Sequence, residues 1–179
     1  FGADEYSSKG SPTIRTTDMT DDGRIVLRNP PKVSVPADRL DDFKCEKGDL
    51  LVTRTGSIGI MAVFTGDYEA IPSAYLIRLR FMTETSVDYI HLVLRSPYGQ
   101  TSLGLNTTKL AQPNINAKNL AAILVPLPPL AEQQRIVAKV DELMALCDKL
   151  GAQLTTTHTE SRRLLEALLH EALKPTITQ

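Results

Sequence analysis

Pro128-Pro129-Leu130-Ala131-Glu132-Gln133-Gln134-Arg135-Ile136-Val137 begins a run of about fifty residues whose apolar positions recur with heptad spacing. Alternating steps of four and three give the row that we expect to form a helix interface: Ile136, Val140, Leu143, Cys147, Leu150, Leu154, Leu164 and Leu168, interrupted by Thr157 and Ser161. A second row, at steps of seven, holds Val137, Met144, Gly151, His158, Leu165 and Ala172. A helix from about 131 to 173 would be roughly 64 Å long. The pattern therefore predicts a long rod that pairs with another helix.

Two parts of this run leave alternatives open. Gly151 and the cluster Thr155-Thr156-Thr157 are poor helix formers, so a break or bend is expected within 151–161. Glu132, Gln133 and Gln134 are either an ordinary polar first turn, with Glu favoured by the helix dipole, or part of an interface with partner subunits.

Residues 1–128 have the pattern of short strands separated by turns. Val87 to Leu94 is predicted to be a helix, with Ser86 as its N-cap and Ser96-Pro97 as its end. Strands are expected at 12–15, 24–27, 50–52, 60–64, 74–81 and 121–125. The predicted fold class is α+β: a strand-rich, mixed α/β domain over 1–128, followed by a coiled-coil-type helix within 129–179.

Composition excludes several classes of protein. The charged fraction is 23% and the net charge is −1, so neither a disordered chain nor a strongly basic DNA-binding protein is indicated. No apolar run reaches the roughly 18 residues of a membrane span, and the first thirty residues do not resemble a signal peptide. The chain begins at Phe1, so we expect it to be a fragment of a longer protein.

No catalytic centre, metal site or cofactor site is predicted. Thr55-Gly56-Ser57-Ile58-Gly59 lacks the Lys-Ser/Thr ending of a P-loop and the third glycine of a dinucleotide fingerprint. Ser96-Pro97-Tyr98-Gly99 is similar to the Pro-Pro-Tyr stretch of amino-methyltransferases but lacks its second proline. The histidines have no partners at ligand spacing, and Cys45 and Cys147 are expected to be small apolar residues rather than a disulfide or a nucleophile.

Three stretches together resemble the specificity (S) subunits of type I restriction–modification systems. They are 126–137 running into the long helix, 10–15 near the start, and 48–59, Gly-Asp-Leu-Leu-Val-Thr-Arg-Thr-Gly-Ser-Ile-Gly. The resemblance covers essentially the whole chain. The chain departs from the family pattern in one respect: a full S subunit has two recognition domains and two helices, whereas this sequence has one of each.

The resemblance implies a non-catalytic half subunit, corresponding to the C-terminal half of an S subunit, in the cytoplasm of a prokaryote. Its recognition domain would read one half of a bipartite double-stranded DNA target. Its helix would pair antiparallel with that of the other half or of a second copy, and would dock methyltransferase (M) subunits and, indirectly, the restriction (R) subunit. The near-neutral charge of the chain fits a domain that contacts the bases while other subunits of the same complex make most of the phosphate contacts.

The residues expected to contact DNA are polar or cationic side chains on loops, because Arg, Lys, Asn and Thr supply base-edge and phosphate contacts. They are Arg15, Lys32, Arg54, Thr55, Ser57, Asn106, Thr107, Thr108 and Lys109. Two rival functions stay open on the sequence: an assembly module whose coiled coil oligomerises without base reading, and a methyltransferase remnant.

Overall fold

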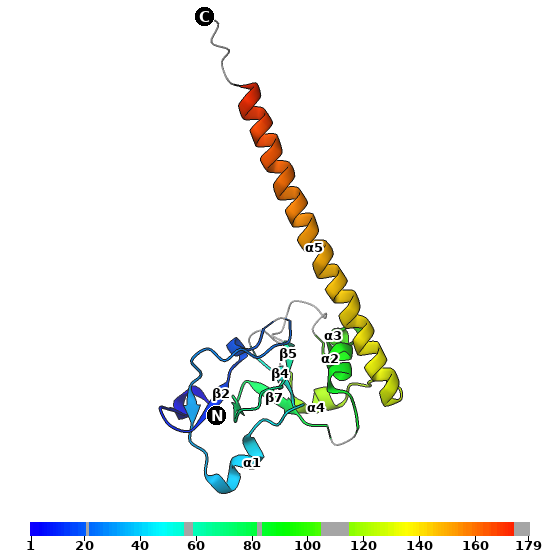
Figure 1. Cartoon of the computed structure of the whole chain (residues 1–179). Coiled ribbons are helices and arrows are strands. Elements are labelled where there is room, and N and C mark those ends of the chain that lie inside the picture. Colours follow the sequence, from blue (N-terminus) through cyan, green and yellow to red (C-terminus); the bar gives the residue numbers. More distant parts are fainter. Residues whose placement is uncertain (21, 56–58, 82–83, 105–114, 174–179) are drawn as a thin grey trace, which may run out of the picture. The chain divides into compact units, whose positions relative to one another are not determined.

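The computed structural model describes residues 1–20, 22–55, 59–81, 84–104 and 115–173. The chain divides into two compact units, Phe1–Gln134 and Arg135–Gln179, and each is considered by itself. The second unit is the greater part of a single helix, α5 (Leu130–Ala172), whose first turn belongs to the first unit (Figure 1). The predicted functional boundary at 128 stays a prediction.

Two small sheets form the strand-rich part of the first unit. The first has the order β1-β3-β2-β6, with antiparallel β1/β3 and β3/β2 pairs and a parallel β2/β6 pair: β1 Tyr6–Ser7, β2 Ser11–Ile14, β3 Lys32–Val33 and β6 Ile71–Pro72. The second is antiparallel, in the order β5-β4-β7: β4 Leu50–Thr53, β5 Met61–Val63 and β7 Leu76–Leu79.

Short helices complete the first unit. Helix α2 (Val87–Arg95) has the predicted N-cap, because the Ser86 hydroxyl accepts the Tyr89 N–H at 3.2 Å. The ring nitrogen Nε2 of His91 lies 3.2 Å from the Met61 carbonyl oxygen, which joins α2 to β5. The remaining helices are α1 Leu40–Phe43, α3 Pro97–Ser102 and α4 Ala117–Ala121, with 3₁₀ turns η1 Ala3–Glu5, η2 Thr16–Asp18 and η3 Ala37–Arg39.

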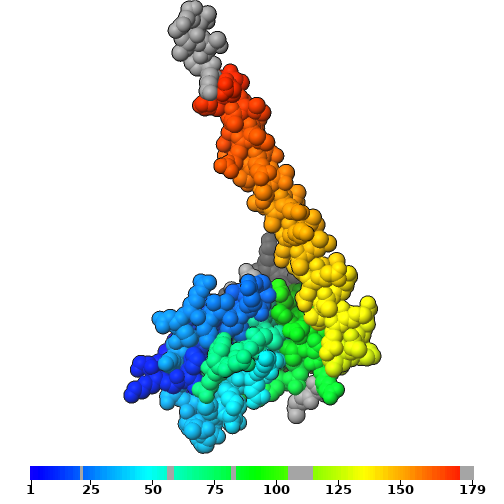
Figure 2. Space-filling model, in the orientation of Figure 1, coloured from blue at the N-terminus to red at the C-terminus, as the bar shows by residue number. Residues whose placement is uncertain are grey.

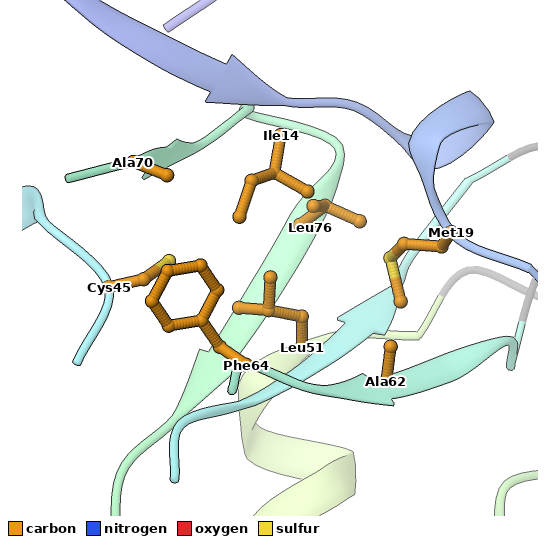
Figure 3. Packing of buried hydrophobic residues seen from close by; sticks show 8 residues of the cluster. All are labelled: Ile14, Met19, Cys45, Leu51, Ala62, Phe64, Ala70 and Leu76. Carbon is orange, nitrogen blue, oxygen red and sulfur yellow. The ribbon is translucent and has the colours of Figure 1, made fainter. Parts of the chain in front are cut away.

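The hydrophobic core lies where the two sheets face each other, and Phe64 is its largest side chain (Figure 3). Strand β4 contributes Leu51 and strand β2 contributes Ile14, both fully buried. The other members come from loops and neighbouring strands: Met19, Cys45, Ala62, Ala70 and Leu76. The core therefore joins residues far apart in the chain into one folding unit.

A buried carboxylate ties the Gly48-Asp49 turn to strand β7. Asp49 is 2% exposed and accepts hydrogen bonds from the Arg80 Nε and Nη2 atoms, both at 2.9 Å, and from the Glu46 N–H at 2.8 Å. The Arg78 Nε atom lies 3.9 Å from the same carboxylate. Burial of a charge is tolerated here because it is paired and hydrogen-bonded. This part of the 48–59 motif thus has a structural explanation.

The α+β class, the long helix and the end of α2 at Ser96-Pro97 are confirmed, whereas two of the predicted strands are wrong. Residues 24–27 form only an isolated bridge between Met19 and Ile25 instead of a strand. Residues 121–125 form no strand: Ala121 ends helix α4, 122–125 follow it, and Leu124 is 81% exposed. Helix α2 ends at Arg95 with Ser96 as its C-cap, and Ser96 is also the N-cap of a second helix, α3, since its hydroxyl accepts the Gly99 N–H at 3.3 Å.

Helix α5 is continuous through 151–161, so the expected break is absent. The threonine hydroxyls donate to carbonyls four residues earlier: Thr155 to Gly151 at 2.9 Å and Thr156 to Ala152 at 3.0 Å. These bonds occupy the side-chain hydroxyls, which would otherwise compete for backbone groups of the helix. No helix in the described residues has the length and apolar character that a membrane crossing requires.

Candidate nucleic-acid interface

A polar hollow of about 450 Å³ lies beside the first sheet. Two of the sequence-predicted DNA contacts, Arg15 and Lys32, both line it. The rest of its wall is Tyr6, Ser7, Ser8, Asn29, Pro30 and Pro31. Asn29 has a φ of 49°, a left-handed conformation that Asn tolerates better than most residues. It turns the chain just before the two prolines that lead into β3.

Arg15 is held in place by a buried partner that sequence reasoning missed. Its Nε and Nη2 atoms donate to the two oxygens of Asp18 at 2.9 Å, and its own N–H donates to the same carboxylate at 2.9 Å. Asp18 is 2% exposed, whereas the Arg15 side chain is 33% exposed. Hydrogen bonding to Asp18 raises the pKa of Arg15 above its ordinary value, so the guanidinium stays charged. The ion pair fixes one edge of the Arg15 guanidinium. The spacing of three residues between Arg15 and Asp18 is the signal in the sequence from which this pair could have been predicted.

Lys32 reaches the hollow because of strand register. It pairs with Ser7 on one side and Pro12 on the other, and it is exposed while its neighbour Val33 is fully buried. Alternation along a strand therefore places the lysine on the outer face. Among the residues that the structure describes, its ammonium group has no hydrogen-bond or ion-pair partner, which leaves it available to an anion.

Arg54 and Thr55 lie on a different surface, the loop that follows β4. The base of this loop is closed by Thr53, whose N–H donates to the Ile60 carbonyl at 3.0 Å and whose hydroxyl accepts the Ile60 N–H at 3.1 Å. Arg54 is half-buried, and its N–H donates to the Tyr75 carbonyl at 3.0 Å. Within the described parts of the chain, its guanidinium has no side-chain or backbone partner. A cation is thus presented on a loop with a fixed base.

Tyr75 is a candidate contact that the sequence reading overlooked. It lies beside Arg54 through the backbone hydrogen bond above, and it is 49% exposed. We predicted one strand over 74–81, but the strand begins at Leu76, so Tyr75 belongs to the preceding turn. An exposed aromatic ring next to an arginine is suited to contact with bases or sugars.

The structure brings Arg15 and Lys32 into one hollow, and that hollow includes neither Arg54 nor Thr55. Four further predicted contacts, Asn106, Thr107, Thr108 and Lys109, and also Ser57, lie outside the described residues. None of the nine assignments is tested by the fold itself, and they remain predictions.

The predicted helix-interface row lies along α5, which is coloured from yellow to red in Figure 2. Most residues of the row are exposed. Ile136 and Val140 are half-buried, and Cys147 is exposed. The leucines of the row are between 49% and 71% exposed: Leu143, Leu150, Leu154, Leu164 and Leu168. So long an apolar row on a helix is typical of a surface that another protein element covers. The identity of that element stays a prediction.

Neither cysteine forms a disulfide, and Cys45 is unsuited to nucleophilic chemistry. Burial raises the pKa of the Cys45 thiol to about 12, so almost no thiolate is present at neutral pH. Among the described residues no group of three His, Cys, Asp or Glu side chains is placed to hold a metal ion.

Comparison with known proteins supplies the family. The model of the type I restriction modification DNA specificity domain matches residues 3–157. The chain is 29% identical over 171 residues to the type I restriction enzyme EcoBI specificity subunit of Escherichia coli, covering 94% of this chain and 36% of that protein. It is 28% identical over 148 residues to the EcoKI specificity subunit of E. coli strain K12, covering 78% of this chain and 32% of that protein.

The fold has a solved counterpart in the crystal structure of the HsdS subunit from Thermoanaerobacter tengcongensis. The TM-score is 0.74 at 21% identity, over 94% of this chain and 44% of that one. The chain thus spans about a third of the length of these curated relatives. Because the family model covers most of its length, this chain belongs to the type I restriction modification DNA specificity domain family.

Proposed function

We propose that the first unit is a sequence-specific DNA recognition module of a type I restriction–modification enzyme, reading one half of a bipartite target. The observation that carries the proposal is the family match over residues 3–157, taken with two cations of the matched region, Lys32 and Arg54, whose charged groups have no partner among the described residues. The relatives are named as specificity subunits of restriction enzymes, which supports the same role here.

The two cationic surfaces would make different kinds of DNA contact, one with the phosphate backbone and one with a base. Lys32 has a compact charge in an open polar hollow, which suits a phosphate oxygen. The guanidinium of Arg54 has no partner in the described parts of the chain and lies on a loop whose base is closed by Thr53, which suits bidentate contact with guanine. Arg15 has its fork partly occupied by Asp18, so we assign it a contact with the backbone rather than with a base.

The helix α5 would serve as spacer and docking surface. Its apolar row would pair antiparallel with the helix of another recognition half or of a second copy, and the assembled pair would bind M subunits and, through them, the R subunit. The module would carry no catalytic centre of its own. No observation favours an oligomerisation module that does not read bases.

The proposal is tested by selection from a pool of randomised duplexes, with the chain alone and with M subunits added. We expect enrichment of a short defined half-site. Recovery of unrelated sequences under both conditions would overturn the proposal.

Two substitutions then separate base reading from phosphate contact. Arg54→Ala should cost roughly 1–3 kcal/mol on the selected site and relax specificity at one position. Lys32→Ala should weaken binding to all sequences and reduce the slope of log K against log salt by about 0.9. Lys47→Ala is the control, because Lys47 is exposed and belongs to neither surface.

A further inference from the structure

The proline segment before α5 is clamped along its length by side chains of the first unit. Three of its carbonyls, at alternate residues, accept hydrogen bonds. The Tyr98 hydroxyl donates to the Leu124 carbonyl at 2.6 Å, and the Tyr89 hydroxyl donates to the Pro126 carbonyl at 2.9 Å. The Gln133 Nε2 atom donates to the Pro128 carbonyl at 2.8 Å. A segment with this composition is extended, because each residue before a proline avoids helical backbone angles.

Gln133 also reaches helix α2. Its Oε1 atom accepts the Ser86 N–H at 3.0 Å, across 47 positions of sequence. In a capping box, the side chain of the third helical residue satisfies this N–H, but here that residue is Tyr89, which lacks such an acceptor. Gln133 supplies the missing acceptor from the first turn of α5. One amide thus joins the beginning of α2, the end of the proline segment and the start of α5.

Burial makes this contact energetically significant. Gln133 is 2% exposed and is the one buried residue of α5. Its neighbour Gln134 is exposed. A buried amide with both ends bonded is stabilising, whereas its removal takes away the partners of the part-buried Ser86 N–H and Pro128 carbonyl. The two alternatives left open by the sequence, a polar first turn or a surface for partner subunits, therefore do not describe Gln133.

We propose that Gln133 is a positioning residue for the spacer: it fixes the first turn of α5 to the recognition unit and thereby narrows the range of directions that the rest of the helix can take. This inference rests on the proposed function for its consequence, which is that the spacing between two half-sites is set partly by this amide. The proline segment becomes a clamped connection rather than a hinge.

The direct test measures a distance distribution between the two units. Cys147 is exposed and Cys45 is buried, so one native site takes a spin label. Lys47→Cys supplies the second site on the recognition unit, where the side chain is 74% exposed. Labelled chain is diluted into unlabelled chain, so that each distance lies within one molecule. Gln133→Ala should widen the distribution at least about twofold, and the control Gln134→Ala should leave it unchanged.

An unchanged width in folded Gln133→Ala would overturn the proposal. If that variant fails to fold, Gln133→Glu replaces it, because Glu keeps the acceptor for Ser86 and loses the donor to Pro128. Widening is again expected, and an unchanged width in folded Gln133→Glu counts equally against the joint.

A second readout connects the joint to DNA. In the assembled two-half complex, Gln133→Ala should retain the selected half-site and accept a wider range of spacer lengths than wild type. If the variant accepts the same spacer lengths as wild type although its distance distribution is wider, the claim that Gln133 helps to set the spacing of the half-sites is refuted. Failure of wild type to select any half-site would refute the proposed function. The distance measurement would still show whether Gln133 anchors the first turn of α5.

Discussion

Replacing Asp49 by Asn should destabilise the first unit strongly without changing which DNA half-site the protein prefers. Asp49 belongs to the 48–59 stretch that carries the family resemblance, so a role in DNA contact is the competing explanation. Its carboxylate is 2% exposed and accepts two hydrogen bonds from Arg80 and one from the Glu46 N–H. It faces the inside of the unit.

The magnitude follows from what the substitution leaves behind. Asn keeps one acceptor oxygen, but its amide donors face the donors of Arg80, and Arg78 loses its nearby counter-charge at 3.9 Å. Removing one partner of a buried ion pair costs about 3–5 kcal/mol. Because the Arg80 side chain is 37% exposed and regains water in the variant, we expect the lower end, about 3 kcal/mol.

The assay is urea unfolding followed by circular dichroism, with Asp67→Asn as the matched control. Asp67 is 91% exposed and lies 4.0 Å from Lys47, so its loss should change the free energy of unfolding by less than about 0.5 kcal/mol. A loss below about 1 kcal/mol for Asp49→Asn, or an altered half-site with normal stability, would refute this reasoning.

Three further predictions concern separate features. Burial lowers the pKa of His91 below 6.5, so the unfolded chain binds more protons than the folded chain near that pH, and the melting temperature should fall as the pH is lowered from 7.5 to 5.5. His91→Asn should make this fall smaller, whereas an equal fall in the variant would exclude His91 as its source. Gly151→Ala should stabilise α5 by up to about 1 kcal/mol in thermal melts of helicity, because an added Cβ meets nothing within 4 Å; a loss of helicity would contradict this. A thiol reagent should modify one cysteine rapidly in the native protein and none in Cys147→Ser, since Cys45 is buried with a pKa of about 12; fast reaction of Cys147→Ser would show that Cys45 is accessible.

Local patterns predicted the helical parts of this fold well. Heptad spacing was sufficient for α5, and Ser86 followed by Val87, Ile90 and Leu94 was sufficient for α2, because caps and helix faces are set by residues close in sequence. The break expected within 151–161 was wrong: the helix is continuous there, and the threonine hydroxyls bond to carbonyls of the preceding turn rather than to backbone groups in a non-helical conformation.

Pairings between distant residues were not predictable in the same way. Strands β1, β3 and β6 have two residues each, too few for any periodicity, and they exist through their partners. The joint at Gln133 depends on Ser86, 47 positions away, and nothing local distinguishes Gln133 from Gln134. For the candidate site, Arg15 and Lys32 were both proposed from their residue types, but their shared hollow follows from the β2/β3 register.

The central claim is that the first unit distinguishes one DNA sequence from another. The most direct measurement is the ratio of dissociation constants for the selected half-site and a shuffled duplex of the same composition, taken at fixed physiological salt. We predict a ratio of at least about tenfold, corresponding to one good base contact of about 1.4 kcal/mol. A ratio near one at every salt concentration would contradict the claim.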